Sequence, residues 1–395
     1  MTYRFDRGAD RSDGNAEKYV LRQKLFGTDD VLPMWVADMD IETAPCVLEA
    51  VRKRAEHPVY GYEEMPDAAF EAQIAWMRRR HGLILERAWM RFSPSVVATL
   101  NVAIQAYTKP GEKVIVQPPV YPPFFKSVER NGRVVLNNPL KRTEEGEYTF
   151  DFDDLREQID ADTKLLLLCS PHNPVGRVWR EEELRILAGI CLEHGIKVVA
   201  DEIHSDLVFA PHRHIPFASL DDAVRDITLT ALGPGKSFNV AGLAISTVAI
   251  PDAGMRAAFD AVYESIHFAQ GTIFGHVGFE AAYREGEVWL EALLAHLRAN
   301  LAKLERVVAR YPGLIRMRVP EGTYLAWLEC TAMGLEGRAL RRFFIEEAQL
   351  GLSPGISFGR EGAGFMRMNV AVPTDTMEEA LRRLDSALGR FSGSA

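Results

Sequence analysis

The sequence predicts an α/β protein of two domains, the larger one built on a mostly parallel central sheet with helices on both faces. The chain has 395 residues, of which 47% are hydrophobic and 26% charged, enough to bury a sizeable core. Short runs that are apolar throughout alternate with helical patterns, as expected for strands covered on both faces. Beyond about Glu285 one long helix and a few shorter strands follow, which predicts a separate, smaller α+β domain.

The first elements after the N-terminus are predicted to be helices, because apolar residues recur at helical spacing over 43–57 and 67–80. Apolar runs bounded by turn residues then predict strands at 113–117, 164–170, 197–202, 227–232 and 245–250. The helical patterns between these runs make parallel crossover connections natural. A long helix over 288–311 and a closing helix from Met377 complete the pattern.

These elements divide the chain into three parts. Residues 1–42 form an arm and contribute to the small domain, 43–285 form the large domain, and 286–395 form the small C-terminal domain. No Pro- or Gly-rich linker or repeat marks the joints.

Composition argues against several classes of function. A net charge of −9 disfavours nucleic acid as a partner, because binding a phosphate backbone needs a basic face. The polar N-terminus and the lack of a run of 18 apolar residues predict neither a signal peptide nor a membrane span. The four cysteines lie far apart without metal-ligand spacing, so we expect reduced thiols, a cytoplasmic protein and no metal.

Polar segments follow the predicted strands, at the sheet edge where open α/β sheets bind ligands. They are Ser170-Pro-His-Asn173-Pro-Val-Gly176, Asp201-Glu-Ile-His204 and Gly233-Pro-Gly-Lys236-Ser-Phe-Asn, together with Ser93-Pro-Ser95-Val-Val before a helix. The sequence therefore predicts that an Asn, an Asp, a His and a Lys share one crevice.

Lys236 is the candidate reactive group of this crevice. An isolated lysine is usually a solvated side chain, but Lys236 follows a buried strand and two glycines that let the backbone pass close to a ligand. Desolvation there would favour the free amine that Schiff-base formation requires. Asp201 could simply cap a helix, yet beside Lys236 a buried carboxylate could instead keep a pyridine nitrogen protonated.

Taken in order, the segments SPHNPVG, DEIH, GKSFNVAGL and GAGFMRMN resemble those of fold type I pyridoxal-phosphate (PLP) enzymes. Within that superfamily the chain looks most like the MalY/PatB group of carbon–sulfur β-lyases, through LPMWVADMD, VYGYEEMPD, QPPVYPPF, CSPHNPVGRVW and DEIHSDLVF. The resemblance runs nearly end to end and implies the fold type I architecture, with PLP as cofactor.

The resemblance implies roles around the cofactor ring. Lys236 forms the Schiff base, and Asp201 faces the pyridine nitrogen. Asn173 donates toward the ring hydroxyl oxygen and also lies near the substrate. His204 takes a position where many relatives have tyrosine, and Tyr121 is similar to the aromatic residue that stacks on the ring.

The resemblance also implies how the substrate is held and where the phosphate site departs from the pattern. Arg367 resembles the arginine that binds the substrate α-carboxylate, with the backbone of Ala37 close by. Relatives commonly have a serine and an arginine where this chain has Gly233 and Ala244. The remaining phosphate ligands are the backbone N–H groups of Ser95, Val96 and Val97 at a helix N-terminus, the Ser95 hydroxyl, and Tyr62 from a neighbouring subunit.

The implied reaction begins when Lys236 removes the α-proton of an amino acid. Expulsion of a thiolate from the β-carbon gives pyruvate and ammonia, whereas return of the proton to the cofactor gives transamination. The MalY-like segments favour elimination from cystathionine or a related cysteine conjugate. An aminotransferase of a small or aromatic amino acid, or a PLP-binding regulator with little turnover, remains possible.

Three further expectations complete the interpretation. Gly235-Lys236-Ser237 could end a nucleotide-binding P-loop, but the glycine needed six residues before the lysine is Thr230. His212 and His214 lie among prolines and are expected in a surface loop without a carboxylate partner. A homodimer with shared active sites is expected, because the arm and Tyr62 have no evident partner within one chain.

Overall fold

The computed structural model describes residues 3–11, 14–267 and 271–394. In this part of the chain a seven-stranded sheet forms the centre of the large domain, in the order β2-β10-β9-β8-β7-β3-β4. Strands β9, β8, β7, β3 and β4 are parallel, whereas β10 runs antiparallel to both its neighbours. The strands are β2 (Met90–Ser93), β3 (Lys113–Val116), β4 (Val134–Asn137), β7 (Thr163–Cys169), β8 (Lys197–Asp201), β9 (Thr228–Leu232) and β10 (Ser246–Ala249).

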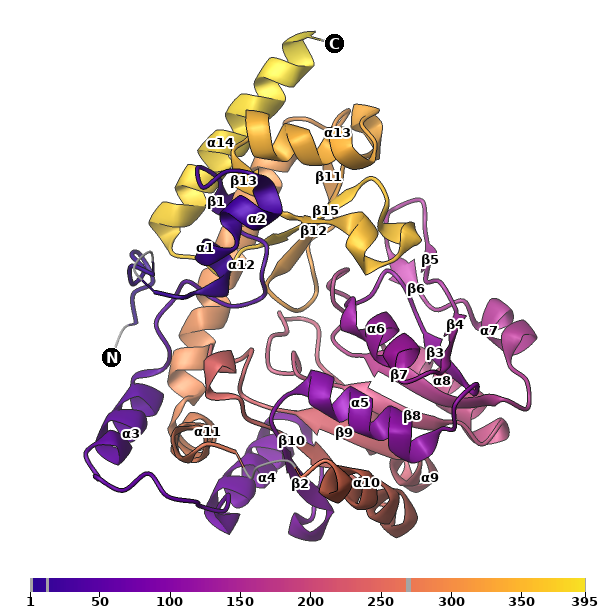
Figure 1. The fold of residues 1–395 in the computed structure, drawn as a ribbon. Coiled ribbons are helices and arrows are strands. Elements are labelled where there is room, and N and C mark those ends of the chain that lie inside the picture. The colour runs from indigo at the N-terminus through magenta and orange to yellow at the C-terminus, as the bar shows by residue number, and fades with distance from the viewer. Residues whose placement is uncertain (1–2, 12–13, 268–270, 395) are drawn as a thin grey trace.

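Helices cover both faces of this sheet because the strands are apolar on both sides. On one face pack α5 (Val96–Tyr107), α6 (Pro123–Arg130) and α10 (Ala253–Ser265). On the other face pack α7 (Phe152–Gln158), α8 (Glu181–Glu193) and α9 (Asp222–Asp226). Figure 1 shows these layers in the lower right of the molecule. The carboxyl ends of the parallel strands meet at one edge of this sandwich, which positions the polar segments that follow them.

The small domain is an antiparallel sheet packed against long helices. Its strands run in the order β11-β12-β15-β14, and they are β11 (Arg316–Met317), β12 (Leu325–Glu329), β14 (Ser353–Pro354) and β15 (Phe365–Asn369). The helices are α12 (Glu287–Val308), α13 (Gly337–Arg342) and α14 (Thr374–Ser394). Helix α12 runs from the large domain up into the small one (Figure 1), so one rigid element joins the two.

The N-terminal arm packs on the small domain of its own chain. Strand β1 (Leu32–Pro33) pairs in parallel with β13 (Leu350–Gly351), and α1 (Glu17–Val20) and α2 (Arg22–Phe26) lie beside them. The expectation that the arm has no partner within one chain was therefore wrong.

Helices α3 (Pro45–Ala55), α4 (Asp67–His81) and α11 (Ile273–Glu285) form a further group at the edge of the large domain. Their inner residues join the large core cluster that continues along α12 into the small domain. Both early helices and all five middle strands lie where the sequence predicts them. No helix among the described residues combines the length and hydrophobicity that a membrane span requires.

The prediction for His214 was wrong. This side chain is buried, and its Nε2 lies 2.9 Å from the Glu202 carboxylate. Glu202 directly follows β8 and also accepts the backbone N–H of Phe217 at 2.8 Å, so it draws the loop that carries His214 onto the core. The sequence signal of flanking prolines was misleading because the partner lies 12 residues away. The described residues hold no group of three His, Cys, Asp or Glu side chains suited to a metal.

Candidate active site

A cavity of about 660 Å³ lies where the polar segments of the large domain face the arm and the small domain. It is lined by every predicted site residue except Tyr62, namely Ala37, Ser95, Val96, Val97, Tyr121, Asn173, Asp201, His204, Lys236 and Arg367. The sequence thus predicted that these side chains lie together. The most distant of them, Ala37 and Arg367, are 330 residues apart in the chain and line the same cavity.

Lys236 lies on the turn that follows β9 and extends into this cavity. Its Nζ donates a hydrogen bond to the backbone carbonyl of Ala37 at 2.6 Å. Burial and the positive charge of Arg367 lower the pKa of Lys236 to about 8, against the opposing effects of Asp38 and Asp201. A substantial neutral fraction near physiological pH follows, and the neutral amine is the nucleophile for a carbonyl.

Asp201 is the last residue of β8 and is almost fully buried. Burial raises its pKa to about 7, although the backbone N–H of Ile203, at 3.2 Å from Oδ1, and the nearby Lys236 oppose the rise. A carboxyl group in this state has no strong cationic partner of its own, and it would gain one from a protonated ring nitrogen.

His204 and Tyr121 flank the same space. His204 is buried, its Nδ1 lacks a hydrogen-bond partner among the described residues, and burial with the charges of Lys236 and Arg367 lowers its pKa well below the ordinary value. The imidazole is therefore neutral. Burial, and then the negative charge of Asp201, raise the pKa of Tyr121, so its phenol keeps its proton. Both rings can serve as neutral neighbours of an aromatic ligand.

Arg367 lies in the middle of β15, and burial lowers its pKa to about 10. Its Nη1 donates to Asn173 Oδ1 at 2.9 Å, and its Nη2 donates to the backbone carbonyl of Trp35 at 2.7 Å. The guanidinium also lies over the ring of Phe358, 4.7 Å from its centroid. Nε has no acceptor among the described residues, which leaves donor capacity for a carboxylate.

The segment around Ala37 is held by side chains whose roles sequence reasoning missed. Asn369 donates to the carbonyls of Val36 and Asp38 at 2.7 and 2.6 Å, and the hydroxyl of Tyr324 donates to the carbonyl of Ala37 at 2.9 Å. Asn369 stands in the motif FMRMN, where the adjacent arginine drew attention first. A buried asparagine two residues from a site arginine was the available signal.

Charged residues of the arm also hold this segment, through ion pairs with Asp38 and Asp40. The fully buried Lys18 places its ammonium 3.0 Å from Asp38 Oδ1 and 2.9 Å from Asp40 Oδ2. Arg11 pairs with both carboxylates at 2.7 Å. Burial alone would raise the pKa of Asp38, but Lys18 and Arg11 hold it below the usual value. Nothing in the sequence connects these four charges, which meet only because the arm folds back.

Position 233, which the resemblance places near the cofactor phosphate, is a glycine with little room for a side chain. A Cβ on Gly233 would lie 3.0 Å from the Cβ of Ser246 and 3.1 Å from Cδ1 of Ile203. Ser246 itself lines the cavity, and it was not predicted. Ser95 caps α5, its hydroxyl oxygen accepting the N–H of Ala98 at 3.2 Å, so the first turn of this helix faces the cavity.

Tyr62 lies apart from the cavity. Its side chain is fully exposed in an extended segment between α3 and α4. Ala244 has a left-handed backbone, with φ of 50°, and is also outside the cavity lining. Within one chain neither residue lines the cavity that contains Lys236.

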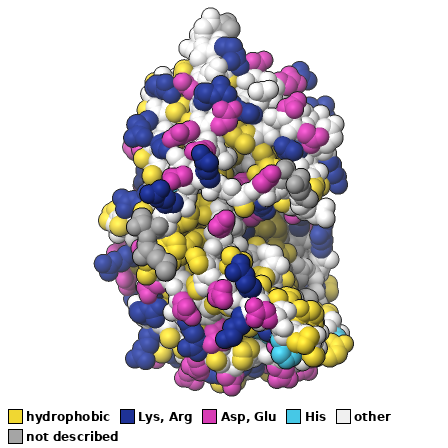
Figure 2. Space-filling view, turned by 90° about the vertical axis from the view of Figure 1, so that its left-hand side faces the viewer, with side chains coloured by type: hydrophobic (Ala, Val, Ile, Leu, Met, Phe, Trp, Pro, Cys, Tyr) yellow, Lys and Arg dark blue, Asp and Glu magenta, His cyan; other side chains and the backbone are white. Residues whose placement is uncertain are grey.

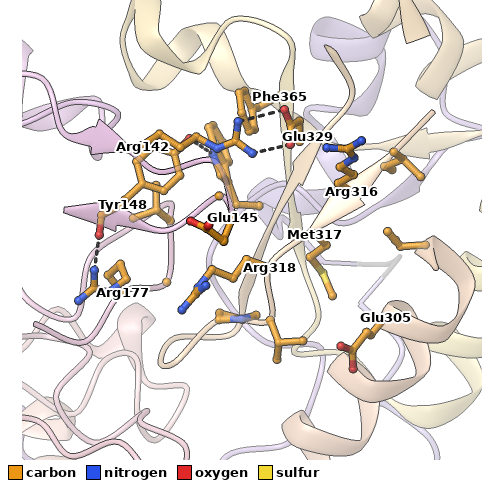
Figure 3. A pocket seen from close by; sticks show the side chains of 18 of the residues that line it. Arg142, Glu145, Tyr148, Arg177, Glu305, Arg316, Met317, Arg318, Glu329 and Phe365 are labelled. Atoms are coloured by element: carbon orange, nitrogen blue, oxygen red, sulfur yellow. Dashed lines mark hydrogen bonds and ion pairs between the residues drawn. The ribbon is translucent and has the colours of Figure 1, made fainter. Parts of the chain in front are cut away.

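A second cavity, of about 450 Å³, opens between the hairpin β5 (Lys141–Arg142) and β6 (Tyr148–Thr149) and the strand β11 (Figure 3). Arg142 reaches across it to Glu329, with Nη1 3.0 Å from Oε1. Arg318 pairs with Glu147 at 3.3 Å. None of the predicted site residues lines this cavity, so we interpret it as a joint between the domains.

Comparisons with known proteins agree with this geometry. A sequence model of the family described as "Aminotransferase class I and II" matches residues 29–384. Cystathionine beta-lyase PatB of Bacillus subtilis is 40% identical over 385 residues, which cover 97% of this chain and 99% of that protein. Protein MalY of Escherichia coli is 34% identical, covering 92% of this chain and 93% of its own.

A solved structure shows the same likeness in three dimensions. The crystal structure of cystalysin from Treponema denticola, which contains pyridoxal 5'-phosphate, superposes with a TM-score of 0.95 at 32% identity and covers 99% of this chain and 100% of its own. The sheet order, the cavity and the sequence match all point the same way. This chain belongs to the class I and II aminotransferase family of PLP-dependent enzymes, with the fold type I architecture.

Proposed function

We propose that this enzyme is a PLP-dependent carbon–sulfur β-lyase that acts on cystathionine or a related cysteine conjugate. One observation carries the proposal: three side chains with the required chemistry line the same cavity. They are Lys236, an amine with a lowered pKa; Asp201, a buried acid; and Arg367, a guanidinium whose Nε has no acceptor among the described residues. The name of the relative PatB, a cystathionine beta-lyase, supports the reaction class.

The residues present fit the cofactor at each of its polar groups. Lys236 offers an amine to the aldehyde, and Asp201 offers a carboxylate to the pyridine nitrogen. His204, whose Nδ1 lacks a partner, and Asn173 lie at the same cavity for the ring hydroxyl. For the phosphate we propose the N–H groups of Ser95, Val96 and Val97 at the start of α5, with the hydroxyls of Ser95 and Ser246.

The bound cofactor supplies an electron sink that stabilises negative charge at the substrate α-carbon. Asp201 keeps the pyridine nitrogen protonated, because a buried carboxylate is stabilised by a cation beside it. Lys236 takes the α-proton at Nζ once its amine is free, and its lowered pKa suits a general base near neutral pH. Tyr121 covers the ring and, with its raised pKa, remains a neutral phenol.

Arg367 binds the substrate α-carboxylate in this proposal. Its free Nε and its fixed Nη groups present a fork that is already positioned by Asn173 and the carbonyl of Trp35. The backbone around Ala37 borders the same place and is held by Asn369 and Tyr324. In this proposal the hydrogen-bonded Arg367 and the backbone around Ala37 orient the substrate α-carbon toward Lys236.

We further propose that the enzyme is a homodimer in which Tyr62 reaches the active site of the neighbouring subunit. Val59, Tyr60 and Tyr62 are all exposed large side chains of one segment. This segment adjoins α3 on the face shown in Figure 2, where hydrophobic side chains gather among charged ones. Sedimentation analysis of the wild type and of Tyr62→Ala tests the idea. Full activity of a monomer would contradict it.

Elimination and transamination use the same side chains, so two parallel incubations are needed to separate the candidate reactions. Purified protein with PLP is supplied with cystathionine, and separately with alanine and 2-oxoglutarate, while thiol, pyruvate and glutamate are measured. Thiol release with pyruvate supports the lyase. Glutamate without thiol would assign the aminotransferase activity that the family description names. Neither product, with a covalent adduct at Lys236, would assign a regulator.

A further inference from the structure

We infer that the part of the active-site cavity contributed by the arm and the small domain is a binding site for a second amino-acid group, carried at the far end of a thioether substrate. This inference rests on the proposed function and names its substrate class. The site, called the distal subsite below, is lined by Glu17, Leu25, Phe26, Trp35, Arg341 and Leu352. Apart from Trp35, whose backbone carbonyl positions Arg367, none of these residues carries a role in the reaction derived above.

Arg341 is the positive end of the distal subsite. It lies in α13, is half-buried, and donates from Nη2 to the backbone carbonyl of Leu25. Its Nε is buried without an acceptor, and no carboxylate pairs with it in the part of the chain that the structure describes. Part of the guanidinium therefore meets solvent, but the buried Nε–H has no acceptor among the described residues, and a buried donor without an acceptor is unfavourable. A ligand carboxylate would supply that acceptor through a two-pronged contact.

Glu17 is the negative end. It is the first residue of α1 and lines the cavity. Its side chain is exposed, and its charge contributes, after burial and Asp201, to the raised pKa of Tyr121, another residue of the cavity lining. Its neighbour Lys18 fixes the helix, because Lys18 is buried against Asp38 and Asp40 and its carbonyl accepts from Trp35 Nε1 at 3.1 Å. The position of Glu17 is therefore set by the fold.

Apolar side chains lie at the same cavity with these two charges. Phe26 and Leu352 are buried, and Leu25 and Trp35 are partly buried. Such a lining suits methylene groups and a polarisable thioether sulfur. An amine and a carboxylate beyond an apolar stretch are the features of a cysteine thioether that ends in a second amino acid, as in cystathionine. A simple S-alkyl cysteine would leave Arg341 and Glu17 unpaired, so it should be the poorer substrate.

The kinetic test compares two substrates that differ only at the distal end. We measure kcat/KM for L-cystathionine and for S-ethyl-L-cysteine and take the ratio. Replacement Arg341→Met should lower this ratio roughly 10- to 100-fold, as expected for loss of hydrogen bonds to a charged group. Glu17→Gln should lower it about 2- to 5-fold, since Glu17 is more exposed. The matched control Arg342→Met removes the adjacent exposed arginine, which pairs with Glu346, and should leave the ratio within twofold.

A binding measurement supplies a readout that does not depend on turnover. The probes are 2,7-diaminosuberate, in which a methylene replaces the cystathionine sulfur, and norleucine, which lacks the distal group. Calorimetry should show tighter binding of 2,7-diaminosuberate to the wild type, and Arg341→Met should abolish that preference.

Three results would overturn the inference. The first is an equal loss of kcat/KM on both substrates in Arg341→Met, which would assign a structural role. The second is a fall in the ratio caused by Lys126→Met instead, because Lys126 is another cation of the cavity lining. The third is a wild type that binds norleucine as tightly as 2,7-diaminosuberate. Failure of the proposed function itself looks different, because no thiol would then be released from either substrate while the binding preference could still be measured.

Discussion

Replacement of Lys18 by methionine tests how strongly the arm supports the active site. The change keeps the side-chain length and removes one charge from a cluster in which Lys18 is fully buried and Asp40 is 6% exposed. Removing one partner of a buried ion pair costs about 3–5 kcal/mol, since the remaining charge is left uncompensated. Arg11 stays in contact with both carboxylates, and Asp38 is 25% exposed, so we expect a loss of about 2–3 kcal/mol.

Urea unfolding of the holoenzyme measures this loss, and kcat/KM reports its effect on the site. We expect kcat/KM to fall as well, because Asp38 adjoins Ala37, whose carbonyl accepts from Lys236. The matched control is Lys24→Met, which removes an exposed lysine of the neighbouring helix α2. A loss of stability below about 1 kcal/mol, or an equal loss in the control, would refute the reasoning.

Further predictions concern ionisation and packing. Capture of PLP by the cofactor-free protein, followed by absorbance, should rise with pH up to about 8 and then level off, as the pKa of Lys236 requires; a rise continuing beyond pH 10 would contradict it. The pKa of Asp201 is raised from 3.8 to about 7 in the folded protein. Between these pH values the folded cofactor-free protein therefore binds more protons than the unfolded chain. Its free energy of unfolding should fall by up to about 4 kcal/mol as pH rises through that window. Urea titrations should show this fall in the wild type and not in Asp201→Asn. Gly189→Ala, on the exposed face of α8 with open space around it, should stabilise the protein by about 0.5–1 kcal/mol, whereas Gly286→Ala would bring a Cβ within 2.3 Å of the Phe238 ring and should cost about 1–3 kcal/mol in thermal unfolding. The packing argument requires the same Gly→Ala change to raise the thermal stability at position 189 and to lower it at position 286.

The sequence was most informative where local chemistry decides the structure. Strands such as β7, which reads TKLLLLC, are predictable because a short run that is apolar throughout and bounded by turn residues is typical of a strand buried on both faces. The direction of β10 was not predictable in the same way. The connection from β9 to β10 contains a short 3-10 helix, Ala241–Leu243, in place of a crossover helix, and the strand therefore returns antiparallel.

Some residues of the candidate site could likewise be predicted from local sequence, whereas others depend on packing between distant segments. Lys236, Asp201 and Asn173 follow strands of one sheet, so their grouping could be inferred from the rule that ligands bind at the carboxyl ends of the strands. Glu17 and Arg341 reach the cavity from the arm and the small domain, whose placement depends on packing between distant segments. No local pattern marks them, so neither residue could be predicted from the sequence. The limited space at 233, where a Cβ would lie 3.0 Å from the Cβ of Ser246, also depends on a distant segment and could not be predicted.

Glu17 and Lys18, which are adjacent in α1, contact different parts of the site, so the short arm affects more than one of its features. Lys18 turns inward to the carboxylates beside Ala37, while Glu17 lines the cavity. A shift of this short helix would therefore move the wall against which Lys236 rests and the group that we propose selects the substrate. Under the roles proposed for Lys236 and Glu17, proton transfer and substrate choice would be coupled through one turn of backbone. The arm lines the same cavity as the segments that carry the lysine and the acid, so a change in its packing should affect both.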